Sequence, residues 1–81
     1  MTFDLQLPLL NWIGLLIEKN NNCKYISILR SITNTFRNCF ALPEETILDV
    51  ANVIVQILEK SLINVDYSND PFICYYVNLN H

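Results

Sequence analysis

The sequence predicts a mainly α-helical fold: one small domain over residues 1–81, with three helices and a C-terminal extended segment, residues 63–81, packed on the third helix. Three observations lead to this prediction. Apolar residues recur at three- and four-residue steps over much of the chain, as they do on one face of an α-helix. Prolines stand where two of the helices should begin. After Leu62 the pattern changes to short β-branched and aromatic stretches around a turn.

The first helix is expected from about Pro8 to Lys19. Proline suits a first helical turn, because the N–H group that it lacks has no partner there in any case. The run Asn20-Asn21-Asn22 then gives a polar, turn-prone stop. The alternative is an earlier start capped by Asp4, which would place Pro8 where its ring crowds the preceding turn.

The second helix is expected from about Lys24 to Phe40. Apolar side chains near Ile28, Ile32 and Phe36 follow helical spacing, and serine, asparagine and arginine fill the other side. Its β-branched and asparagine residues are weak helix formers, so packing must hold this helix in place.

The third helix is the best marked, from Pro43 to about Leu62. Glu44 and Glu45 in its first turn complement the helix dipole. At 100° per residue its apolar side chains spread over about 220° of arc. A surface helix needs an apolar stripe of only about 100°. We therefore expect this helix to be packed on most of its circumference.

The C-terminal part has a different character. Residues 63–67 indicate a short extended piece, residues 68–71 a turn, and Phe72 to Leu79 a β-prone segment. A β-hairpin would account for both extended pieces. It should lie on the third helix, since a hairpin alone is barely stable in water. The alternatives are a short helix, a disordered tail, or a strand that pairs with another chain.

The chain is more apolar than its size explains. Hydrophobic residues make up 52% of it and charged residues only 16%, whereas soluble domains average about 25% charged. A chain this short buries only roughly 60–65% of its unfolded surface. The apolar side chains that the core cannot bury must lie in an interface, a ligand cavity or a lipid boundary.

Polar residues interrupt both long apolar runs, Leu5–Ile17 and Ile47–Leu58, before either reaches the roughly 20 residues of a membrane span. No basic segment precedes the first run, as a signal peptide would require. Cys23, Cys39 and Cys74 form no CxxC pair and indicate buried free thiols. We expect a cytoplasmic protein in a reducing compartment, without a membrane partner.

The residues that most enzymes need are scarce. The single histidine, His81, is the last residue, so neither a Ser-His-Asp triad nor a Cys-His pair can be assembled in the usual way. The single glycine, Gly14, excludes a glycine-rich phosphate loop. The carboxylates Glu45 and Asp49 fit a solvated helix surface better than an acid–base pair. We expect no enzymatic activity, no cofactor and no metal site.

A noncatalytic protein–protein interaction module is the function that fits best: an adaptor, an inhibitor or immunity-like protein, or a viral accessory protein. Its partner would be another protein, and it would also form a homodimer through the apolar face of the third helix, because obligate interfaces resemble a domain core cut in half. Tyrosines in the tail are suited to a binding surface. The interface candidates are Trp12, Leu15, Val50, Val53, Ile57, Tyr67, Asp70, Phe72, Tyr75 and Tyr76.

Two alternatives remain. A nucleic-acid-binding helical domain would use Lys24, Arg30, Asn34 and Arg37 of the second helix, although the net charge of −3 opposes such binding. An acyl-carrier-like or apolar-ligand-binding domain would instead enclose the surplus in a cavity.

Two stretches resemble known families. Leu42-Pro43-Glu44-Glu45, followed by Ile47, Val53 and Ile57, is similar to the second half of acyl carrier proteins, which implies a helical carrier domain; the Asp-Ser that carries phosphopantetheine in that family is missing here. Asp70 with Tyr75-Tyr76, after a helix with an acidic start, resembles small acidic bacteriocin immunity proteins, which implies toxin binding through acidic and tyrosine residues. The spacing differs from that family, and its final helix has no counterpart here.

Overall fold

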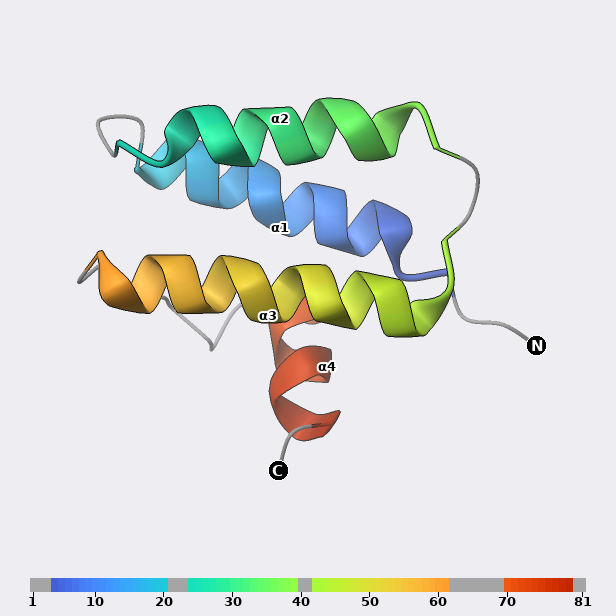
Figure 1. Cartoon of the computed structure of the whole chain (residues 1–81). Helices are drawn as coiled ribbons and strands as arrows, with labels where there is room; N and C mark the ends of the chain where they lie inside the picture. The colour runs from blue at the N-terminus through green and yellow to red at the C-terminus, as the bar shows by residue number, and fades with distance from the viewer. Residues whose placement is uncertain (1–3, 21–23, 40–41, 62–69, 80–81) are drawn as a thin grey trace.

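The computed structural model describes residues 4–20, 24–39, 42–61 and 70–79, which form helices without any β-strand. The helices are α1 (Gln6–Lys19), α2 (Ile26–Arg37), α3 (Glu44–Lys60) and α4 (Pro71–Leu79). Helix α1 is central and contacts the other three. Helices α2 and α3 run antiparallel on either side of it, and α4 crosses them steeply near the middle of α3 (Figure 1). The predicted mainly helical class is confirmed.

Helix α1 begins at Gln6, two residues before the predicted start. The Asp4 carboxylate accepts a hydrogen bond from the Gln6 backbone N–H at 2.9 Å, and the Leu9 N–H donates to the Leu5 carbonyl at 2.9 Å. Pro8 is thus the third helical residue. It is tolerated there because the first four N–H groups of a helix have no intrahelical acceptor.

Helix α2 is shorter at both ends than predicted, running from Ile26 to Arg37 instead of Lys24 to Phe40. At its end the Asn38 and Cys39 N–H groups donate to carbonyls three residues back, the tighter bonding typical of a final turn. The Asn38 side chain donates to the Asn34 carbonyl at 3.0 Å. These bonds satisfy carbonyls that the end of the helix leaves without partners.

Helix α3 begins as the sequence indicates. Pro43 is its N-cap residue, with extended backbone angles, and Glu44 and Glu45 lie in the first turn. After Lys60 the chain leaves the helix at Ser61, whose hydroxyl donates to the Ile57 carbonyl at 2.8 Å. The predicted end at Leu62 lies outside the described residues.

The prediction of an extended segment from Phe72 to Leu79 was wrong, because residues 71–79 form α4. Asp70 caps this helix: its carboxylate accepts hydrogen bonds from the backbone N–H groups of Phe72 at 2.8 Å and Ile73 at 3.1 Å. Pro71 supplies a fixed first helical residue. These two start signals outweigh the β-propensity of the residues that follow. The expected strand at residues 63–67 lies outside the described residues.

The core lies where α1 meets the other helices. Trp12 of α1 packs against Phe72 of α4, with ring centroids 5.4 Å apart and planes tilted by 31°. Helix α4 therefore packs against α1, whereas the hairpin was expected to lie on the third helix. The buried apolar residues are Leu5, Leu9, Trp12, Ile13, Leu16, Ile26, Leu29, Ile47, Ala51, Ile54, Val55, Leu58, Phe72 and Ile73.

The molecule is flat, with extents of 38 × 31 × 18 Å. Its shortest dimension is less than twice the roughly 10–12 Å diameter of a helix with its side chains. None of the described helices combines the length and apolarity needed to cross a bilayer.

Candidate protein-interaction surface

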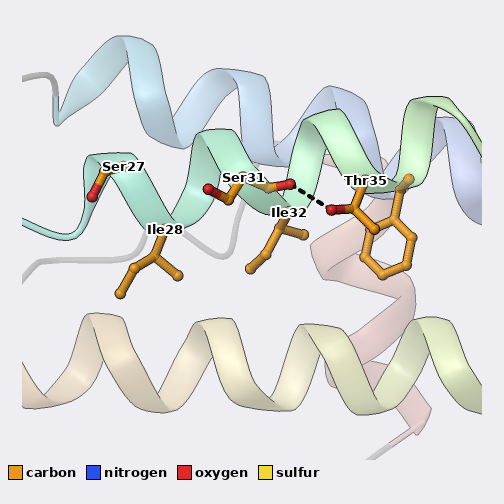
Figure 2. Close-up of a pocket in the computed structure, with 6 residues that line it drawn as sticks. Ser27, Ile28, Ser31, Ile32 and Thr35 are labelled. Carbon is orange, nitrogen blue, oxygen red and sulfur yellow. Dashed lines mark hydrogen bonds between the residues drawn. The ribbon is translucent and has the colours of Figure 1, made fainter.

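An open groove of about 330 Å³ runs along α2, and the residues that line it all belong to this helix: Ser27, Ile28, Ser31, Ile32, Thr35 and Phe36. Ile28 and Ile32 point from α2 toward α3 in Figure 2, and the hydroxyls of the two serines and Thr35 lie along the rim. The Thr35 hydroxyl donates to the Ser31 carbonyl at 2.9 Å. The groove thus has an apolar interior and an uncharged polar edge.

Helix α2 carries two apolar rows, of which only one is fully buried in the core. Ile26 and Leu29, followed by Thr33, face the core and are buried. Thr33 is compatible with that position because its hydroxyl donates to the Leu29 carbonyl at 3.0 Å. The second row begins at Ile28, which is 42% exposed, and continues four and eight residues later through half-buried side chains. This row is the wall of the groove.

On α3, the flank with Val50, Val53 and Ile57 lies roughly opposite Glu44 and Asn52 on a helical wheel. The hydroxyl of Tyr75 donates to the Glu44 carboxylate at 2.5 Å, and that of Tyr76 donates to the Asn52 side chain, so α4 covers the flank of Glu44 and Asn52.

The valine flank of α3 is therefore the side away from these two hydrogen bonds, and α2 and α3 lie on either side of α1 (Figure 1). Val50 and Ile57 are half-buried, whereas Val53 is 52% exposed. We call the two flanks together the α2–α3 face. Its members are Ile28, Ile32 and Phe36 on α2, and Val50, Val53 and Ile57 on α3.

The interface candidates predicted on helices 1 and 3 are not brought together as one patch. Trp12 is only 2% exposed and belongs to the core. Leu15 is 45% exposed on α1. Val50, Val53 and Ile57 lie on the α2–α3 face, where Val53 is the most accessible of the three.

The tail candidates mainly hold α4 in place. Asp70 caps the helix, and Phe72 is buried against α1. Tyr75 and Tyr76 are half-buried and bonded through their hydroxyls to α3. The hydrogen bond to Glu44 raises the pKa of Tyr75 above its usual value, and partial burial and the negative charge of Glu44 act in the same direction. Tyr67 lies outside the described residues.

The α2 wall of this face was not among the sequence candidates. From the sequence alone, its residues fit the ordinary core-facing stripe of an amphipathic helix. A signal was present, because Ile28, Ile32 and Phe36 form a row with a spacing of four, separate from the row that starts at Ile26 and Leu29. Two apolar rows on one short helix indicate contact with two neighbours.

The nucleic-acid candidates of α2 lie on a different flank. Arg30, Asn34 and Arg37 are exposed and share one side of the helix, away from the groove row. The Lys24 ammonium group lies over the Tyr25 ring, 5.1 Å from its centroid, in a cation–π contact.

A shallower groove of about 290 Å³ lies where the start of α1 meets the end of α2. Leu7, 63% exposed, lies on its wall.

The thiols differ from the expectation of buried cysteines. Cys39 is exposed and Cys74 is half-buried, while Cys23 lies outside the described residues. Within the described ranges no cluster of three or more His, Cys, Asp or Glu side chains could hold a metal ion.

Comparison with protein-family models, with curated proteins and with solved structures found no match to this chain.

Proposed function

We propose that the protein is a noncatalytic interaction module that self-associates through the α2–α3 face. The observation that carries this proposal is the open apolar groove along α2, where Ile28 and Ile32 point toward α3 (Figure 2) and Phe36 lines the same groove. Exposed Val53 on α3 extends the same apolar surface. An accessible apolar groove bordered by polar side chains is typical of binding sites.

The energetic case depends on burying side chains that the monomer leaves accessible. Full burial of an isoleucine or valine side chain stabilises by about 1.5–3 kcal/mol. Ile28 is 42% exposed and Val53 52% exposed, so each can still lose a large part of its contact with water. A symmetric dimer buries both residues twice, because each copy contributes the same patch.

Sedimentation velocity over a range of protein concentrations tests this proposal. We expect the sedimentation coefficient to rise with concentration toward that of a dimer. Val53→Lys should raise the dissociation constant at least tenfold, because it places a charge within the apolar contact. Leu79→Lys is the matched control: Leu79 is 51% exposed but lies on α4, which is bonded to the opposite flank of α3, so this variant should associate like wild type.

Strictly monomeric wild-type protein at high micromolar concentration would contradict the proposal. Equal loss of association in Val53→Lys and Leu79→Lys would place the contact elsewhere. Circular dichroism of both variants checks that the helices remain folded.

A further inference from the structure

The outward side of α3 carries opposite charges at its two ends. Asp49, Val53, Gln56 and Lys60 fall within about 60° on a helical wheel, and all four are exposed. Asp49 lies in the N-terminal half of α3, and Lys60 is its last residue. At 1.5 Å per residue the two are about 16 Å apart along the axis. The row therefore runs from negative to positive, with exposed Val53 between the charges.

This row is complementary to itself when reversed. If a second α3 lies antiparallel, with the two-fold axis passing between Ile54 and Val55, Asp49 falls opposite Lys60 of the partner subunit and Lys60 opposite the partner's Asp49. A parallel arrangement would instead bring equal charges together, which is unfavourable. The charge pattern therefore favours the antiparallel arrangement of the two α3 helices.

Neighbouring charges support the same direction. Helix α2 begins at the end of the molecule where α3 ends (Figure 1), so Lys24 lies at the positive end and Glu45 at the negative end. Three other charged residues face elsewhere. Arg30 and Arg37 lie on the flank of α2 away from the groove, and Glu59 lies near Asn52, on the flank of α3 that α4 covers.

We infer that the occupant of the α2–α3 face is α3 of a second copy, lying antiparallel to the first α3 and paired with it through Asp49 and Lys60. This inference rests on the proposed function, which requires self-association but not this direction. In this arrangement Val53 of each copy enters the groove of the other, and four helices, α2 and α3 from each chain, enclose the apolar residues of the face.

Charge reversal tests the direction. Asp49→Lys alone and Lys60→Asp alone should each raise the dissociation constant at least tenfold, because each change turns two attractive pairs per dimer into repulsive ones. The double variant D49K/K60D should dimerise like wild type, since both pairs are restored with their signs exchanged. An equimolar mixture of the two single variants should form the mixed dimer, which native mass spectrometry identifies by its mass. Arg30→Glu, a reversal on the other flank of α2, should leave association unchanged.

Each outcome has a distinct meaning. If wild-type protein dimerises but the single variants do so equally well, the antiparallel arrangement is wrong and the proposed function stands. The same holds if the single variants weaken and neither the double variant nor the mixture recovers. If wild-type protein stays monomeric at every concentration, both this inference and the proposed self-association fail.

Discussion

Gln6 joins the start of α1 to both ends of the connection between α2 and α3. Its side-chain amide nitrogen donates to the carbonyl oxygens of Phe36 at 2.8 Å and Cys39 at 3.3 Å, and its amide oxygen accepts from the Leu42 N–H at 3.0 Å. We expect Gln6→Ala to lower the free energy of unfolding by about 1–3 kcal/mol, because partly buried backbone groups lose their partner. Urea denaturation measures the loss.

Gln56→Ala is the control for this prediction, measured at a protein concentration low enough to keep the protein monomeric. Gln56 has the same side chain and is exposed on α3. Its removal should change stability by less than about 0.5 kcal/mol. Equal stability of the Gln6→Ala variant and wild type would contradict a role for Gln6 in holding the connection.

The hydrogen bond from Tyr75 to Glu44 predicts a pH dependence at the alkaline end. Because the pKa of Tyr75 is raised, the folded protein keeps the phenolic proton to higher pH than the unfolded chain does. Its contribution to stability is complete below the usual tyrosine pKa of about 10 and is lost as pH rises through the raised value. Wild type should therefore lose its advantage over Tyr75→Phe above about pH 10.

Urea unfolding of both proteins from neutral to alkaline pH measures this difference. A stability difference between wild type and Tyr75→Phe that stays constant through the alkaline range would mean that the proton of Tyr75 does not stabilise the α3–α4 contact.

At the scale of single elements, α4 depends on the cap at its start. Asp70→Ala should destabilise the protein by about 1 kcal/mol, because the N–H groups of Phe72 and Ile73 lose their acceptor. Asp70→Asn keeps a side-chain oxygen and should lose much less. Thermal unfolding followed by circular dichroism compares the two variants, and equal melting temperatures for Asp70→Ala and wild type would contradict the capping role.

Helix α1 contains a position where the helix can be improved. Gly14 lies in its interior and is exposed, and a β-carbon added there would meet no atom within 4 Å. Gly14→Ala should stabilise the protein by about 0.5–1 kcal/mol, since alanine loses less conformational freedom on folding. Chemical denaturation measures the gain, and a loss of stability would show that Gly14 has a role beyond the helix.

The first three elements were predictable from local signals. Pro43 with the two glutamates after it set the start of α3, and apolar periodicity identified α1 and α2. Helix α4 was missed because isoleucine, tyrosine and valine favour strands, and this composition was weighed above the Asp70-Pro71 start signal. The sequence pattern predicts Asp70 as an interface residue, whereas in the structure its carboxylate caps α4.

At the scale of the whole molecule, the arrangement of the helices was not predictable. The width of the apolar arc on the third helix indicated several neighbours, and the structure supplies α1 and α4 for part of it. The central place of α1, which buries Trp12, depends on packing between distant parts of the chain. The groove along α2 likewise exists only once α2 and α3 are placed on either side of α1.

Ionic strength gives a prediction at this scale. Asp49 and Lys60 are exposed, so salt should screen their attraction across the proposed dimer. We expect the dissociation constant to rise moderately between low and physiological salt. The double variant D49K/K60D should show the same dependence, because it keeps the same number of pairs. Sedimentation velocity measures it, and salt-independent association would leave the apolar contacts as the sole source of affinity.

The contact between Trp12 and Phe72 has a practical consequence. Trp12 is the one tryptophan of the chain, and its ring is shielded from water where α4 meets α1. Its fluorescence emission therefore comes from a single place in the molecule. Separation of the C-terminal helix from the rest would admit solvent to the indole and shift its spectrum to the red, so the protein carries an intrinsic optical reporter of that step.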